Sequence, residues 1–294
     1  MSMAKPFDDR TALGRAGRLW RRWPPLVVAA AGVLTLLVFV ALTAQWLRPY
    51  ALDEQDLLNR YAPPVFMGGD WAHPLGTDGI GQDVLSLMLR AIQVSLSIAF
   101  LGTLIGAVGG TILGFAAAHF RGWVDGLVGV LVDFQASLPF IVLALALLAV
   151  MPDADMGTFV ILMCIYGWER YARLARGLAL AAQEQGYVVA QSALGSSPWR
   201  LYLRHILLNI AAVLVVNMSL NFPATILTET SLNFLGIGIE PPDTSLGVLM
   251  GQGRSHLYKA PWIALLPGAV IFVATFSMSI LGDWLRDRLD ATTR

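Results

Sequence analysis

The sequence predicts an all-α integral membrane protein with six transmembrane helices. Hydrophobic residues make up 56% of the 294 residues and charged residues only 14%, against about 25% charged residues in soluble domains. Several runs also lack charge over the roughly 20 residues that a helix needs to cross the hydrocarbon core of a bilayer. The formal net charge is zero, so no overall field favours nucleic acid as a partner.

The first three expected spans are long apolar runs. Residues 26–47 carry no charge, and residues 91–120 contain His119 as their only ionisable group. A cleaved signal peptide has an apolar core of only about 7–15 residues, so we expect the first run to remain as an anchor. Residues 126–151 form the third expected span and contain one acidic residue, Asp133.

The fourth expected span, residues 156–168, is short. It must borrow length from the segment that follows, whose Arg170, Arg173 and Arg176 can extend their side chains to the lipid head groups. The last two expected spans are residues 206–228 and 261–281.

The positions of Lys and Arg predict the orientation, because these residues concentrate in cytoplasmic segments. With six spans and a cytoplasmic N-terminus, the outside segments hold only a few of the 20 Lys and Arg residues: Arg48, Arg60, Arg90, Arg254 and Lys259. The expected organisation is a cytoplasmic tail (1–25), the first span (26–47), an external loop (48–90), a five-helix core (91–285) containing a cytoplasmic segment (183–205), and a cytoplasmic C-terminal tail (286–294).

A stripe of glycines marks the second span. Gly102, Gly106, Gly110 and Gly114 recur every four residues, which places them on one face of a helix and lets another backbone approach closely. We expect this stripe to be a helix-packing seam, either inside the bundle or between subunits.

Polar residues within the spans are candidates for a translocation path, since such groups are costly against lipid. Asn217, Asn221 and Thr225 share one face of the fifth span, and Glu229 adjoins it. This set can line a path or form hydrogen bonds that only hold the bundle together. For Asp133, the sequence favours a structural partner over a role in the path.

Motifs for catalysis are missing from the sequence. Neither Lys5 nor Lys259 lies in a phosphate-binding loop, and the chain has neither the zinc-binding His-Glu-x-x-His pattern nor a Gly-x-Ser-x-Gly elbow. We therefore expect no catalytic residue, no metal ligand and no cofactor on this chain, and we do not expect an enzyme.

The cytoplasmic segment predicts a short helix, a break at Gly195 and a second helix. Ser196 or Ser197 can cap the second helix, with Pro198 in its first turn. Two short helices that meet at a bend would project into the cytosol, where a soluble motor protein can engage them. The alternative is an amphipathic connection that lies on the lipid head groups.

This segment resembles the coupling motif of permease subunits in ABC importers, which reads Glu-Ala-Ala, three residues, then Gly. Ala190 and Gly195 match it, whereas Val189 replaces the Glu and Gln191 replaces the second Ala. Further blocks are similar to the dipeptide/oligopeptide/nickel permeases, in matching order along the chain. They are His-Pro-Leu-Gly-Thr-Asp at 73–78, Gly-Gln-Asp-Val-Leu-Ser at 81–86, Ser-Leu-Asn-Phe-Leu-Gly-Ile-Gly at 231–238, and Leu-Gly-Asp-Trp-Leu-Arg-Asp-Arg-Leu-Asp at 281–290.

The resemblance implies a type I ABC importer transmembrane domain of the C-type permease, in the inner membrane of a bacterium. It implies a related second permease as heterodimer partner, two cytoplasmic ATPases that hold ATP and Mg²⁺, an external solute-binding protein and surrounding lipid. The solute would be peptide-like, most simply a dipeptide or oligopeptide. The residues implied to couple to the ATPase are Val189, Ala190, Leu194, Gly195, Ser196 and Arg204.

A self-contained secondary transporter or channel is the alternative function. It would need no long cytoplasmic connection with a glycine break, and that feature favours the importer.

Overall fold

A computed structural model describes residues 24–150 and 155–290. Residues 1–23 and 291–294, which make up most of the expected N-terminal tail and the end of the C-terminal tail, lie outside the described residues. The described residues form helices and loops and contain no strand. The main helices are α2 (Pro25–Leu47), α3 (Val84–Phe120), α4 (Gly122–Ser137), α5 (Phe140–Leu148), α6 (Met156–Ile165), α7 (Trp168–Gln183), α8 (Gly186–Ala193), α10 (Leu207–Phe234), α11 (Leu246–Gly253) and α12 (Trp262–Asp290).

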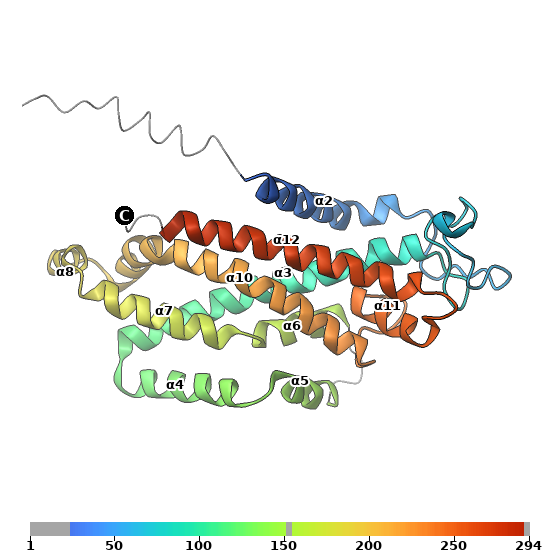
Figure 1. Cartoon of the computed structure of the whole chain (residues 1–294). Helices are drawn as coiled ribbons and strands as arrows, with labels where there is room; N and C mark the ends of the chain where they lie inside the picture. Colours follow the sequence, from blue (N-terminus) through green and yellow to red (C-terminus); the bar gives the residue numbers. More distant parts are fainter. Residues whose placement is uncertain (1–23, 151–154, 291–294) are drawn as a thin grey trace, which may run out of the picture.

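Helix α3 is the centre of the bundle. It packs against α2, α6, α7 and α10, while α12 packs along α2 and α10 (Figure 1). Helix α4 follows the edge formed by α3 and α7. Helix α8 lies at one end of the molecule, and α11 lies at the opposite end beside the loop that precedes α3 (Figure 1).

Four described helical stretches are long and apolar enough to cross a membrane: Pro25–Leu47, Val84–Phe120, Pro198–Phe234 and Trp262–Leu289. A fifth crossing results if α4 and α5, which are bent by 92° relative to each other, count as one span. The bend falls at Pro139, which cannot donate the backbone hydrogen bond that would continue α4. The expected fourth span falls on α6 and α7, which are interrupted at Gly167 with φ of 88°. Six spans are therefore not confirmed.

Two helices extend beyond their expected boundaries. Helix α3 begins at Val84, before the expected end of the external loop, because the Asp83 side chain accepts a hydrogen bond from the backbone N–H of Ser86 (2.8 Å) and caps the helix. Helix α12 continues to Asp290, since the sequence offers no proline after Pro267 to end it.

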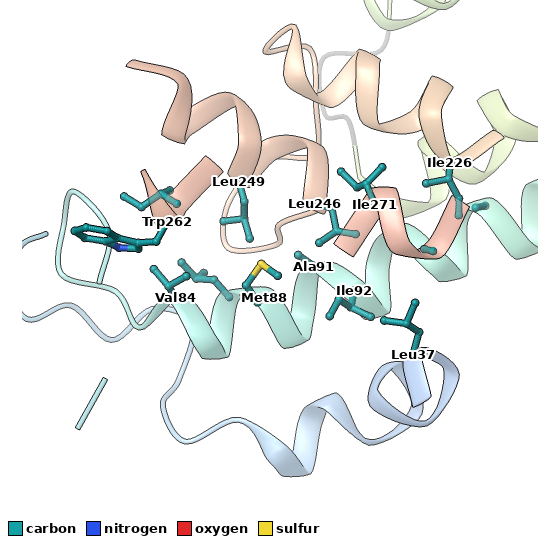
Figure 2. Close-up of a cluster of buried hydrophobic side chains, with 14 of the residues drawn as sticks. Leu37, Val84, Met88, Ala91, Ile92, Ile226, Leu246, Leu249, Trp262 and Ile271 are labelled. Atoms are coloured by element: carbon teal, nitrogen blue, oxygen red, sulfur yellow. The ribbon is translucent and has the colours of Figure 1, made fainter. Parts of the chain in front are cut away.

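A cluster of buried hydrophobic side chains joins four helices to α3 (Figure 2). Val84, Met88 and Ile92 of α3 contact side chains from α2, α10, α11 and α12. Trp262, the first residue of α12, also donates a hydrogen bond from its indole N–H to the carbonyl of Thr77 (3.2 Å). This cluster fastens the loop before α3 to the rest of the bundle.

The glycine stripe of α3 faces α6 and α7. All four glycines are buried, and a Cβ atom added at Gly110 or Gly114 would overlap the carbonyl oxygens of Trp168 or Ala172. At Gly106 the added atom would lie 3.0 Å from the carbonyl oxygen of Cys164, and at Gly102 it would overlap Met163. The stripe therefore lies inside this chain, where bulkier side chains would force the helices apart.

Candidate functional site

The expected cytoplasmic segment forms a bent pair of short helices at one end of the molecule (Figure 1). After α8, Gly195 adopts a left-handed conformation with φ of 78°. The Ser197 hydroxyl then accepts a hydrogen bond from the backbone N–H of Arg200 (3.4 Å), and Pro198 opens the next helix. Glycine tolerates the left-handed region and serine is a favoured helix cap, so this turn follows from local sequence.

Most of the residues implied to couple to an ATPase lie on the surface of this segment. Leu194 is 79% exposed and Val189 is 55% exposed. Ser196 is half-buried, and its hydroxyl donates a hydrogen bond to the side-chain carbonyl of Gln191 (3.1 Å). The exposed members of the set are Val189, Ala190, Leu194, Gly195 and Arg204.

The inner face of the segment is anchored to the bundle by Val188 and Tyr202. Both are buried in a cluster with alanines of α7. Gln183, the last residue of α7, donates a hydrogen bond to the Tyr202 hydroxyl (2.7 Å) and accepts one from Arg121 at the end of α3 (3.1 Å). Sequence reasoning missed Gln183, because its partners lie far from it in the chain and no motif marks it.

Glu229 is fully buried where α3, α10 and α11 meet. Its carboxylate accepts hydrogen bonds from the Ser95 hydroxyl (3.2 Å), the Asn233 amide (3.0 Å) and the Thr230 hydroxyl (3.2 Å). The Ser95 hydroxyl oxygen in turn accepts from the backbone N–H of Leu246, at the start of α11 (3.1 Å). This network ties three helices together at the end of the molecule opposite α8.

The other polar residues of α10 divide into two environments. Thr225 is buried and accepts a hydrogen bond from the Thr103 hydroxyl of α3 (3.2 Å). Asn217 and Asn221 are only half-buried, and the Asn221 amide donates to the Asn217 side-chain carbonyl (2.6 Å). The side-chain carbonyl oxygen of Asn221 accepts from Arg170 of α7 (2.9 Å). The polar face of α10 is thus internal near Thr225 and partly exposed where α10 meets α7.

Asp133 lies on α4 with its side chain 81% exposed, and it forms an ion pair with Arg173 (3.2 Å). Arg176 forms a two-point pair with Asp125 of α4 (2.5 and 2.7 Å). The three arginines of α7 therefore contact polar partners on α4 and α10.

Replacing Glu229 by leucine is expected to destabilise the protein strongly. The substitution leaves the Ser95, Thr230 and Asn233 donors without their acceptor, and each buried unsatisfied polar group costs about 1–3 kcal/mol. Glu229→Gln keeps a side-chain acceptor on a side chain of the same size, so this variant should lose much less stability. Thermal unfolding in detergent measures the stability of both variants. A melting temperature of Glu229→Leu equal to that of Glu229→Gln would contradict a structural role for this network.

Comparison with known proteins decides the family. Residues 110–294 match the family described as binding-protein-dependent transport system inner membrane component. Residues 19–64 match the N-terminal transmembrane domain of oligopeptide transport permease C. The chain belongs to the ABC importer permease family.

Relatives of this permease match it over nearly its whole length. The glutathione transport system permease protein GsiD of Pectobacterium atrosepticum is 34% identical over 92% of this chain and 89% of its own length. GsiD of Escherichia coli O157:H7 is 33% identical over 99% of this chain and 94% of its own. The oligopeptide transport system permease protein OppC of Mycobacterium tuberculosis is 33% identical over 91% and 90%.

A solved structure shows the same fold. A chain of the inward-facing MetNI methionine ABC transporter superposes with a TM-score of 0.55 at 17% identity, covering 68% of this permease and 95% of that chain. The protein is therefore an all-helical, multi-pass permease subunit of an ABC importer, which sets aside the self-contained transporter or channel.

Proposed function

We propose that this permease forms half of the translocation path for a peptide-like solute, with dipeptides and oligopeptides as the most direct candidates. Its relatives are named for glutathione and oligopeptide transport, and both kinds of solute carry amide bonds and free carboxylates. A second, related permease completes the path as a heterodimer partner. An external solute-binding protein delivers the solute, and two cytoplasmic ATPases bind ATP and Mg²⁺.

The bent segment at 183–205 is the observation that carries the coupling role. It exposes apolar side chains, Leu194 above all, at the end of the molecule opposite α11. Val188 and Tyr202 connect the segment to α3 and α7, so a force applied to it would reach the spans. An anchored projection of this kind suits docking onto an ATPase, and this supports the importer over a passive connection on the head groups.

The topology belongs to the same proposal. Helices α6 and α7 together form the fourth of six crossings, and α4 with α5 forms the third. The protein lies in the inner membrane of a bacterium with both termini in the cytoplasm. Helix α8 is then cytoplasmic, and α11 with the loop before α3 is external.

The polar and glycine residues receive different roles. Glu229 and Thr225 hold the external half of the bundle together, in keeping with their burial and hydrogen bonds. The four glycines of α3 let α6 and α7 pack closely. Asn217, Asn221 and Asp133 are only partly covered by this chain, and we assign them to the path or its margin.

Purification of the tagged permease from its native membrane in mild detergent tests the proposal. Mass spectrometry should identify an ATPase and a second permease in near-equal amounts, and a solute-binding protein encoded with them would identify the solute. Recovery of the permease alone, or only as a homo-oligomer, would contradict the proposed assembly.

A further inference from the structure

Arg170 places a charged group at the middle depth of the bundle. Its Nη1 atom donates a hydrogen bond to Asn221 (2.9 Å), which lies near the centre of α10 (Leu207–Phe234). Arg170 itself follows the break between α6 and α7 at Gly167. The Arg170 side chain is nevertheless 48% exposed. A guanidinium at this depth is costly against lipid, so its open side must face protein or water.

The contacts within this chain leave part of the guanidinium free. A guanidinium carries five N–H donors. The Glu169 carboxylate lies 3.6 Å from Nε, and Nη1 binds Asn221. Among the described residues, Nη2 has no hydrogen-bond partner, and the Oε2 atom of Glu169 is also buried without one. The Arg170 guanidinium is therefore held in place and still has N–H donors without a partner among the described residues.

A hollow of about 260 Å³ has in its wall Tyr166, the residue whose ring Arg170 also contacts. It is lined by Phe140 and Tyr166 and by Thr228 and Ser231 of α10, and Arg170 lies 5.5 Å from the centre of the Tyr166 ring. The two hydroxyls donate to backbone carbonyls one turn back in α10, so their oxygens remain as acceptors. The hollow thus offers aromatic surface and hydroxyl oxygens, and a cation lies over one of its lining residues, Tyr166.

We propose that Arg170 is a substrate-contacting residue that receives the carboxylate of the solute partway through the membrane. The inference rests on the proposed function, since it names the part of a peptide-like solute that this site takes. An N–H of the solute would meet Thr228 or Ser231, and its carboxylate would bind the free N–H groups of Arg170. Charge-assisted pairs of this kind are strong and directional. Glu169 offsets part of the positive charge, so the site holds the carboxylate weakly enough to release it, as passage requires.

The test uses the complete importer in proteoliposomes with its binding protein. Uptake is measured by mass spectrometry for a library of di- to tetrapeptides with free C-termini and for the same library as C-terminal amides. Loss of one charge-assisted contact, about 1.5–3 kcal/mol, corresponds to at least a tenfold change in the binding of the solute. We expect Arg170→Gln to lower uptake of the free acids about tenfold or more, and Arg170→Lys to recover part of it.

Two controls separate a substrate contact from a structural role. Arg254→Gln removes another arginine that lies over an aromatic ring, Phe234 (5.4 Å), and should leave uptake unchanged. Hydrolysis of ATP stimulated by the loaded binding protein should also survive in Arg170→Gln, because docking and coupling are intact. For any C-terminal amide that the wild-type importer accepts, Arg170→Gln should reduce uptake less than it does for the corresponding free acid.

The outcomes are distinguishable. Equal uptake of free acids by wild type and Arg170→Gln would overturn the substrate contact and leave the proposed function standing. An equal loss for acids and amides would also overturn it, in favour of a packing role or a contact with the second permease. If the wild-type importer takes up neither library, the peptide-like solute class fails, and this inference fails with it.

Discussion

Gly195→Val is expected to lower solute uptake strongly while the permease still inserts and assembles. Gly195 has φ of 78°, a region that costs an L-residue about 1–2 kcal/mol and is worst for β-branched side chains. Within the described part of the chain, no atom beyond the adjacent residues lies within 4 Å of an added Cβ, so collision is not the cause. The valine would instead redirect the turn between α8 and Pro198 and displace Leu194 from its place on the surface.

The measurement pairs ATP hydrolysis with uptake in reconstituted importers. Gly186→Val is the matched control, because Gly186 lies in the same segment, has no left-handed φ and also has open space around an added Cβ. We expect uptake to fall at least about tenfold for Gly195→Val, with ATP hydrolysis kept but no longer linked to transport. Normal uptake by Gly195→Val would refute the coupling role of this segment.

Gly110→Ala is expected to destabilise the bundle. The new methyl group would overlap the carbonyl oxygen of Trp168 and press on Tyr171, and backbone atoms in a packed seam cannot move aside as a flexible side chain can. Overpacking of this kind costs about 1–3 kcal/mol, which outweighs the roughly 1 kcal/mol that alanine gains over glycine in a helix. Less folded protein and a lower melting temperature in detergent should follow.

Gly109→Ala provides the internal comparison. Gly109 is the preceding residue of α3, and an added Cβ there meets no other described residue within 4 Å. The same substitution should therefore be neutral or slightly stabilising. A melting temperature for Gly110→Ala equal to that of Gly109→Ala would contradict the close approach of α3 and α7.

Several features could be predicted because they depend on neighbours in the chain. The apolar runs predicted α2, α3, α10 and α12, since crossing length and hydrophobicity are local properties. The turn at Gly195 was predicted in the same way, because left-handed backbone and helix caps involve only a few residues. The motif blocks were sufficient to predict the importer permease family, which the relatives confirm.

Other features could not be predicted, because they depend on which helices meet. The periodicity of the glycine stripe predicted a seam, but only the fold shows that α6 and α7 occupy it. Polar residues of α10 that look alike in the sequence also lie in different environments. Thr225 is buried against α3, whereas Asn221 is half-buried beside α7.

By itself, the sequence determined that this protein is helical, lies in a membrane and carries a bent projection between its fourth and fifth expected spans. Only the tertiary structure decided that α4 and α5 bend by 92°, that Gln183 joins Arg121 to Tyr202, and that Arg170 meets Asn221. The reason is physical. Hydrophobic length, glycine backbone freedom and helix capping act over one or two helical turns, whereas the partner of a buried polar group is chosen by the packing of helices that are distant along the chain.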